Sequence, residues 1–371
     1  LRRAMRAGGV RQIALAPYNP ALAPYNQRST SPRTSMNIAV LYNDDASLAH
    51  GDAQDAIAVQ AVAECAAAVA KALRTRGHVA QALGLAPDPR EAVRQVAELR
   101  TELAFNLVEG LGGDPRKDQA FAWLLELHGI AYTGASPRAL GLCLEKPLAR
   151  AVLAAAGLPV PRGAVFERAD APLGDLRFPL IVKPAREDAS HGIAAESVVR
   201  DERALRARAS FVLERYAQPA LVEEYIEARE INAALLAGPR GVELLPLSEI
   251  DYSGFASDEA HIVTYAGKWI EGSRDWNLTQ VIPAREFAAG QRDKLERVAR
   301  RAFDVLGLAD YGRVDFRLDA RDEPFVIDVN PNPDISPGAG FLLAAQRAGL
   351  SYDDVIARIV ESALRRAHPT A

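Results

Sequence analysis

Cysteine is scarce in this 371-residue chain: Cys65 and Cys143 are the only two, and they form no CxxC pair. This scarcity argues against a disulfide framework and against a cysteine-based zinc site. The chain also lacks an apolar run of the length that a membrane-spanning helix needs. Its formal net charge of −4 gives no electrostatic reason to expect nucleic acid or an anionic membrane as a partner. We therefore expect a soluble, cytoplasmic protein with two or three domains.

Acidic residues are absent from the first 35 positions, which contain six arginines. An arginine-rich, acid-free start can mimic a transit peptide, but proline and glycine interrupt any long amphipathic helix in this stretch. Met36 comes directly before the first apolar strand pattern, at 38–42. We expect residues 1–35 to be a disordered extension or the result of a start site assigned too early.

Past Met36 the hydrophobic pattern alternates between strand and helix. This alternation predicts an α/β region, in which a mostly parallel sheet is covered by helices on both faces. Asn106 and Glu109 stand at the end of the third strand, where an open α/β sheet places its ligands. After the segment GLPVP at 157–161, short strands and longer sheet-like stretches predict an α+β region. The strands expected before that segment are 38–42, 79–83, 103–108 and 130–132. The helices expected there are 55–76, 90–99 and 117–128.

A β-hairpin with polar side chains on one face is predicted near the C-terminal end. Residues 313–318 alternate strictly between polar and apolar, and 325–330 follows a polar turn as a second strand. With the turn centred on residues 321 and 322, Asp315 lies opposite Asp328 and Arg313 lies opposite Asn330. Val326 breaks the pattern by falling on the polar face. The apolar face is expected to hold Val314, Phe316, Leu318, Phe325, Ile327 and Val329.

The polar face of this hairpin is suited to a metal ion. Like charges that face each other destabilise a sheet unless something compensates them. The carboxylates of Asp315 and Asp328, with the amide oxygen of Asn330, make a hard oxygen site for Mg²⁺ or Mn²⁺. Arg313 beside them could serve an oxyanion. In the metal-free protein, we expect that removal of one of the two facing charges relieves their repulsion. The alternative to a metal site is a solvent-facing hairpin that binds no ligand.

Two segments upstream have the composition of a nucleotide site. Lys183 ends a buried strand and can neutralise phosphate, while loop amides near Ser190 and Gly192 can approach its oxygens. The alternative is a surface lysine, because neither a Walker A motif nor GxGxxG is present. In LVEEYIEAREI, at 221–231, apolar residues could flank a flat base and Glu230 could hold a ribose hydroxyl. A charged surface hairpin is the alternative there.

Taken in order, five segments between about residues 105 and 363 resemble the ATP-grasp superfamily, most closely its D-alanine:D-alanine ligase branch. They are GLGGDPRKDQAFAWLLELHGIAYTGASPRALGLCLEKPLAR, VKPAREDASHG, EEYIEARE, YAGKWIEGS and YGRVDFRLD with FVIDVNPNPDISPG. The resemblance implies Mg²⁺ held by Asp315, Asp328 and Asn330. It also implies catalytic roles for Arg313, on the transferred phosphate or the tetrahedral intermediate, and for Lys268 near phosphate. The ATP-binding residues that it implies are Lys146, Lys183, Ser190, Gly192, Glu223, Glu224, Tyr225, Ile226 and Glu230.

The resemblance further implies an ATP-grasp fold preceded by a parallel α/β domain. The expected domains are 36–146, which binds substrate, 147–225, a small lobe, and 226–371, a lobe with the metal site. The implied function is an ATP-dependent carboxylate–amine ligase that forms an amide or peptide bond through an acyl phosphate. Its implied partners are small-molecule acids and amines and a second copy of the chain, in a homodimer. A non-catalytic ATP-binding regulatory or scaffold protein is the alternative, and a ligase for peptide or carrier-bound acids is a third hypothesis.

Departures from the family pattern concern the substrate. The amine-binding glutamate of the family has no clean counterpart in YNDDASLAHGD, where Asp44 or Asp45 could replace it. The supporting serine falls on Ala189, and His191 replaces an apolar residue. The tyrosine after the lid lysine is Trp269, and PNPDISPG follows Asn330 in place of Ser-Pro-Gly. We therefore expect a substrate other than D-alanine, in contact with Asp44, Asp45, Glu109, Trp269 and Asp334; Asp334 could equally be a turn residue.

Overall fold

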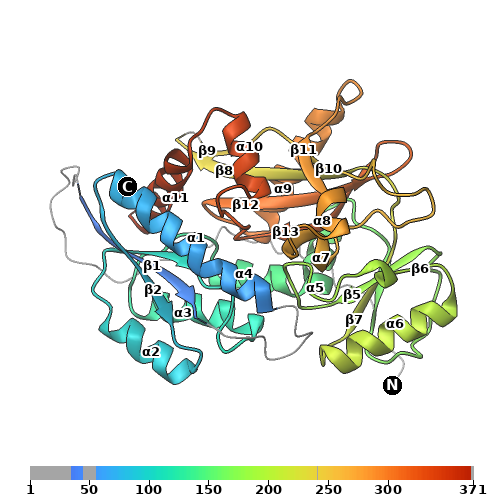
Figure 1. Ribbon diagram of the computed structural model, residues 1–371, viewed down its shortest axis with the longest axis horizontal. Coiled ribbons are helices and arrows are strands. Elements are labelled where there is room, and N and C mark those ends of the chain that lie inside the picture. Colours follow the sequence, from blue (N-terminus) through green and yellow to red (C-terminus); the bar gives the residue numbers. More distant parts are fainter. Residues whose placement is uncertain (1–34, 45–55, 240, 369–371) are drawn as a thin grey trace, which may run out of the picture. The chain divides into compact units, whose positions relative to one another are not determined.

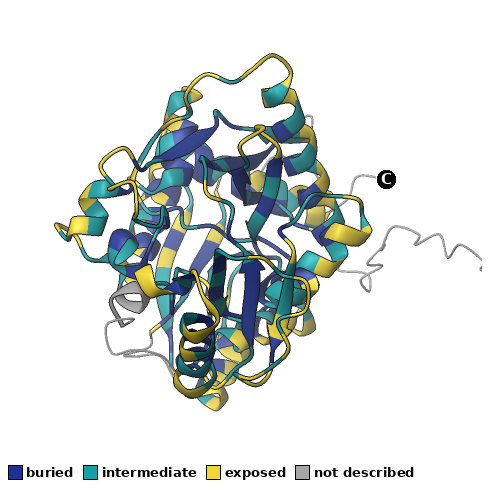
Figure 2. Cartoon of the chain, turned by 90° about the vertical axis from the view of Figure 1, so that its right-hand side faces the viewer, coloured by how far each residue is buried: buried dark blue, intermediate teal, exposed yellow. Residues whose placement is uncertain are grey.

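The computed structural model describes residues 35–44, 56–239 and 241–368, and these belong to one compact unit, Ser35–Ala371. Residues 1–34 of the predicted extension and the candidate residue Asp45 lie outside the described part of the chain. Figure 1 shows the described elements in chain order. In Figure 2 the strands are largely buried, while the helices turn an exposed face outward.

The N-terminal sheet is parallel, as predicted, with strand order β2-β1-β3. The predicted strand at 130–132 is wrong, because only an isolated bridge joins Tyr132 to Ala104. Gly129 and Gly134 on either side adopt positive φ, which leaves too short a stretch for a strand. The elements of this region are β1 (Asn37–Asn43), α1 (Ala56–Thr75), β2 (Val79–Leu85), α2 (Pro89–Glu98), β3 (Leu103–Leu107), η2 (Pro115–Lys117), α3 (Asp118–Leu127), α4 (Pro137–Leu144) and α5 (Lys146–Ala155).

A second sheet is antiparallel, with strand order β4-β7-β5-β6. Helix α6 covers it, and Leu205, Ala209 and Val212 of that helix pack into one core with Val182 and Val222. In Figure 1 this helix and its sheet form the yellow-green part on the right. The elements are β4 (Gly163–Phe166), β5 (Leu180–Pro184), η3 (Ala195–Ser197), β6 (Val198–Val199), α6 (Glu202–Arg215) and β7 (Ala220–Glu224).

The third and largest sheet has the order β11-β10-β8-β12-β13, with β9 paired to β8. The hydrophobic pattern predicts a helix at about 285–306, but α9 begins at Gln291, after Gly290 in the left-handed conformation. The strands of the three sheets span 37–107, 163–224 and 230–330, and the domain boundaries remain a prediction. The elements are β8 (Glu230–Gly238), β9 (Gly241–Leu244), β10 (Ser248–Asp251), α7 (Tyr265–Trp269), α8 (Arg274–Leu278), β11 (Gln280–Pro283), α9 (Gln291–Leu306), β12 (Tyr311–Leu318), β13 (Pro324–Asn330), α10 (Gly340–Arg347) and α11 (Tyr352–Ala367).

The predicted register of the β12–β13 hairpin is confirmed at the end far from the turn and is wrong next to the turn. Asp315 pairs with Asp328 and Arg313 with Asn330, but a β-bulge follows, and Phe316 pairs with Val326. An extra residue in one strand reverses the faces of the residues beyond it. Val326 is therefore buried in the core, whereas Ile327 lies in a cavity wall. The bulge explains why Val326 broke the alternation.

A buried aspartate ties the start of β12 to two distant parts of the chain. Asp310 is 3% exposed, adopts a positive φ of 60°, and accepts a hydrogen bond from the backbone N–H of Gly134 at 2.8 Å. Arg366 of α11 pairs with the same carboxylate at 2.9 Å. The neighbouring N–H of Ala135 donates to Asn332, directly after β13, at 2.9 Å. The turn at 133–135 is thereby fixed to both ends of the hairpin.

We predict that Asp310→Ala lowers the free energy of unfolding by about 3 kcal/mol, because it leaves Arg366 without its buried partner and strains the backbone. Asp310→Asn should cost only about 1–2 kcal/mol, since asparagine tolerates positive φ and can still accept from Gly134. Urea unfolding measures both values. Asp304→Ala, at an exposed position on α9, is the control and should stay within about 0.5 kcal/mol. Equal losses for alanine and asparagine at position 310 would contradict the backbone part of this account.

Candidate functional site

The predicted site residues gather around one cavity of about 1090 Å³. Its wall combines the second sheet, the polar faces of β8, β12 and β13, helix α7 and part of α1. Apolar side chains, among them Ile181, Ile226 and Ile327, form one portion of this wall. The predicted residues that line it are Lys146, Lys183, Ser190, Glu223, Glu224, Tyr225, Ile226, Glu230, Lys268, Trp269, Arg313, Asp315, Asp328, Asn330 and Asp334.

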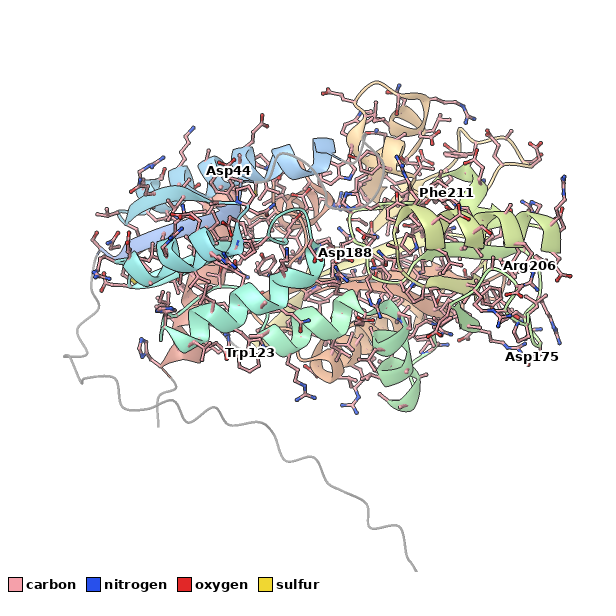
Figure 3. All side chains as sticks on the ribbon, turned by 90° about the horizontal axis from the view of Figure 1, so that it is seen from below. Asp44, Trp123, Asp175, Asp188, Arg206 and Phe211 are labelled. Carbon is pink, nitrogen blue, oxygen red and sulfur yellow. The ribbon has the colours of Figure 1, made fainter. Side chains whose placement is uncertain are left out.

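Three of the predicted residues that the structure describes are not part of this wall: Gly192, Asp44 and Glu109. The carbonyl of Gly192 accepts a hydrogen bond from Ser197, so the residue faces its own loop. In Figure 3, Asp44 lies among the blue and cyan N-terminal elements, whereas Asp188 lies centrally, where these elements meet the green ones. The side chain of Glu109 is exposed.

The facing carboxylates of the hairpin are surrounded by hydrogen-bond donors. Arg313 holds both oxygens of Asp315, through Nε at 2.7 Å and Nη2 at 2.8 Å. Asn232 of β8 donates to one of these oxygens at 2.9 Å, and Asn330 donates to the other at 3.1 Å. Planar, two-pronged pairing of this kind is among the strongest that arginine forms. Asp315 is thus fixed in place, with its charge compensated.

Lys146 and Lys183 complete the compensation. Lys146 contacts Asp188 at 2.8 Å and Asp328 at 3.1 Å, and Lys183 contacts Glu223 at 2.6 Å. Burial alone would raise the pKa of Asp328, but the two lysines, with Arg313, hold it below its usual value. Burial alone would lower the pKa of Lys146, but Asp188 and Asp328 more than offset this and raise it. Both groups are therefore charged at neutral pH.

The EEYIEARE segment lies at the apolar end of the cavity. Glu223 is 2% exposed and is paired with Arg150 at 2.8 Å as well as with Lys183. Glu230 accepts a hydrogen bond from the hydroxyl of Tyr252 at 2.7 Å and pairs with Arg317 at 2.7 Å. These contacts hold both carboxylates in place in the cavity wall.

Helix α7 is joined to the loop that follows β5. The indole N–H of Trp269 donates to the backbone carbonyl of Ala189 at 2.9 Å, and the backbone N–H of Tyr265 donates to Ile193 at 2.9 Å. Lys268 therefore stands over the cavity, where burial and the charge of Arg313 lower its pKa. These contacts place a lysine, an indole and the 185–193 loop along one edge of the cavity.

The sequence patterns did not identify several residues of the site, although some of them stand out from their neighbours in the sequence. Asn232 is the single polar residue in the otherwise apolar run 231–237 of β8, and it pairs in register with Asp315. Arg317 continues the alternation of Arg313 and Asp315 along β12. Asp188 gave no signal, because its partner Lys146 is 42 positions away.

Among the described residues, no group of three or more histidine, cysteine, aspartate or glutamate side chains is arranged to hold a metal ion. The candidate metal ligands are two carboxylates, of Asp315 and Asp328, and the amide of Asn330. None of the described helices is both long enough and apolar enough to cross a membrane.

Comparisons with known proteins point in one direction. A family model described as D-ala D-ala ligase C-terminus matches residues 152–361. An uncharacterized protein, y4sG, of Sinorhizobium fredii is 36% identical over 71% of this chain and 75% of its own length. A D-alanine–D-alanine ligase of Desulforudis audaxviator is 32% identical over 81% of this chain and 92% of its own. The crystal structure of a D-alanine–D-alanine ligase from Bacillus anthracis complexed with ATP superposes with a TM-score of 0.70. That match covers 90% of this chain and 99% of the other at 20% identity, which shows a shared fold.

We predict that Asp328→Asn destabilises the ligand-free protein by about 1 kcal/mol at pH 7, because the partly exposed carboxylate loses its pairing with Lys146. The ion pair with Lys146 and the lowered pKa of Asp328 argue against the expectation of relieved repulsion, because Lys146, Lys183 and Arg313 favour the charged carboxylate. A lowered pKa contributes stability above the unfolded value, about 3.9, and the contribution is lost as pH falls through the folded value. Urea unfolding should therefore show the full difference at pH 7, shrinking only below about pH 4. A more stable variant at pH 7 would restore the repulsion view.

Proposed function

The chain belongs to the D-alanine–D-alanine ligase family and is an ATP-dependent ligase of C–N bonds, and from this premise we propose that it joins an acid other than D-alanine to an amine. The convergence of three lysines, Arg313 and the facing carboxylates on one cavity supports the ligase activity, and Trp269 and Ala189 in the same wall carry the proposed choice of acid. A protein that only binds nucleotide has no use for an arginine placed beside the metal ligands. The non-catalytic alternative has no support in the comparisons.

The residues of the cavity fit ATP and a divalent ion. Its apolar wall suits a flat base, and Glu223 and Glu224 border that wall. Lys146, Lys183 and Lys268 offer positive charge for phosphates. Asp315, Asp328 and Asn330 would hold Mg²⁺ or Mn²⁺, because ionised carboxylates and an amide oxygen are ligands that these ions prefer. When bound, ATP supplies the phosphoryl group that activates the acid, and the metal offsets phosphate charge.

Two of the three lysines that line the cavity have internal partners that a ligand can replace. Lys146 is paired with Asp188 and Asp328, and Lys183 with Glu223. Phosphate oxygens would take the place of carboxylate oxygens on these ammonium groups, so neither lysine has to be buried uncompensated at any stage. Holding the phosphates in line with the attacking carboxylate is the main contribution that a protein makes to such a transfer.

Arg313 pairs with a proposed metal ligand in the ligand-free protein. Its guanidinium holds both oxygens of Asp315, and Asn232 and Asn330 each donate to one of them. A carboxylate oxygen can ligate a metal and still accept a hydrogen bond, so Asp315 could hold the ion with Arg313 beside it. The remaining N–H groups of Arg313 would stabilise the oxyanion that forms when the amine attacks the activated acid, an effect worth about 3–4 kcal/mol per donor. Arg313 would thus orient a metal ligand and act on the substrate.

Three lining residues, Trp269, Ala189 and Asp334, support an acid substrate other than D-alanine. Trp269 lines the cavity with a large apolar ring, and Ala189 offers no hydroxyl for a polar contact. Asp334 lines it too, which favours a cationic amine, but its carboxylate also accepts the backbone N–H of Ser336 at 2.8 Å, as a turn residue does. A bulkier and less polar acid with a positively charged amine fits this wall best.

We predict that the purified chain releases ADP in the presence of Mg²⁺ only when a suitable acid and amine are supplied, with the amide identified by mass spectrometry. Asp328→Asn should lower turnover more than about tenfold, because one of two carboxylate ligands is lost, while ATP binding weakens less. Asp322→Asn is the matched control, since it makes the same change at the exposed turn of the same hairpin. Metal-dependent turnover of Asp328→Asn within tenfold of the wild type would remove the metal assignment.

We also predict that D-alanine is a poor acid substrate, with a kcat/KM at least about tenfold below that of the best acid in a panel. A site that binds an α-ammonium group loses several kcal/mol when its charged partner is missing, because the substrate charge is then desolvated without a counterion. Steady-state ADP release across D-amino acids, L-amino acids and short peptides measures the ratio. A kcat/KM for D-alanine that rivals the best acid would show that Asp44 or Asp45 binds the amine.

A further inference from the structure

A histidine in the 185–193 loop has one ring nitrogen held and the other without a partner. Nδ1 of His191 lies 3.3 Å from Oε2 of Glu187. The other carboxylate oxygen of Glu187, Oε1, accepts a hydrogen bond from Gln218 at 2.8 Å. Glu187 is 7% exposed and His191 is 9% exposed. Nε2 of His191 is shielded from solvent and has no hydrogen-bond partner among the described residues. A buried carboxylate thus fixes the imidazole, and the opposite nitrogen is left for something else.

The position of this histidine points to a ligand. His191 and Glu187 both line the cavity, as do Ser190 and Lys268. The imidazole stacks on the ring of Tyr265, with the centroids 5.7 Å apart and the planes at 28°. Tyr265 belongs to α7, the helix that also carries Lys268. The histidine therefore sits where the 185–193 loop meets α7, in the wall of the cavity that Lys268 also lines.

We propose that His191 binds the terminal phosphate of the bound nucleotide, with Nδ1–H donating to Glu187 and Nε2–H donating to a phosphate oxygen. This inference rests on the ATP-dependent function proposed above. A phosphate oxygen is only an acceptor, so both ring nitrogens must carry protons, and the imidazolium is the active form. Glu187 would stabilise that cation and fix the direction of Nε2, as a carboxylate does for histidine in other sites.

Charged groups of both signs lie around the ring. On its own loop His191 meets Glu187 directly and has Asp188 nearby. Glu109, beyond the end of β3, interacts electrostatically with both His191 and Asp188. The cations are Lys268, on α7 with Tyr265, and Arg208 of α6, which bonds to the adjacent Gly192. A phosphate bound at Nε2 would add negative charge beside the ring, which favours the imidazolium in the complex.

The test is calorimetric binding of two probes, the ATP analogue AMP-PNP and ADP, each with Mg²⁺. His191→Phe keeps the ring stacking on Tyr265 but removes both nitrogens. We expect it to bind AMP-PNP about tenfold more weakly than the wild type at pH 6.5, and ADP within about twofold. The ratio of wild-type to variant affinity for AMP-PNP should fall as pH rises from 6.5 to 8.5, and comparison at one pH cancels the titration of the nucleotide. His128→Gln, at an exposed position after α3, is the control and should match the wild type.

Glu187→Gln provides a second variant with the histidine intact. It should weaken AMP-PNP binding by a smaller factor, and its affinity should fall at lower pH than that of the wild type, because the imidazolium has lost its counterion. Equal losses for ADP and AMP-PNP, or unchanged AMP-PNP binding in His191→Phe, would overturn the assignment. The assignment would also be overturned if the ratio of wild-type to variant affinity for AMP-PNP rose between pH 6.5 and 8.5. That result would make Nε2 a proton acceptor for the amine. Binding is measured without acid or amine, so this test can succeed even if no pair of substrates releases ADP.

Discussion

Two carboxylates that face each other across the β12–β13 ladder must be balanced by positive charge, and much of the cavity is built to supply it. Arg313 comes from the same strand, Lys146 from α5 and Lys183 from β5, while Asn232 of β8 adds a neutral donor. The backbone carbonyl of Ile327 also accepts from Lys183, at 3.3 Å. Because these groups belong to separate sheets and helices, the charge balance joins the parts of the chain around one point.

The same balance prepares the site for exchange. Lys146, Lys183 and Arg313 each have a carboxylate partner, and Asp315 and Asp328 each have a cation as partner. A nucleotide with its metal brings both signs of charge, so its binding can exchange partners without leaving a buried charge unpaired. The desolvation of these ionised groups has largely taken place on folding. The ligand therefore has mainly to replace their present partners in the ion pairs.

The sequence predicted the outline of this site because its strongest signals are local. Alternation along 313–318 gave the polar face of β12, and the spacing of Asp315 and Asp328 about a short turn gave their pairing. The bulge at Ile327 could not be placed, because one extra residue in a strand leaves only a broken alternation, here at Val326, without showing where the register shifts. The partners of Lys146 and Glu230 also could not be read, since ion pairs across 42 and 87 positions follow from the packing of whole elements. The start of α9 was missed because Arg285 belongs to the loop that pairs with Glu249, before Gly290 turns the chain.

The hydrogen bond from Trp269 to the 185–193 loop ends on a main-chain oxygen, that of Ala189. A contact to the backbone does not depend on which side chain stands at that position. Ala189 adopts a positive φ of 55°, so the residues tolerated there are limited by backbone conformation, with glycine and asparagine as the easiest replacements. The junction between α7 and the loop can therefore persist through sequence drift at position 189, while the same drift alters what the cavity wall offers to a substrate. The side chain at position 189 can therefore change substrate preference while the contact between α7 and the loop is kept.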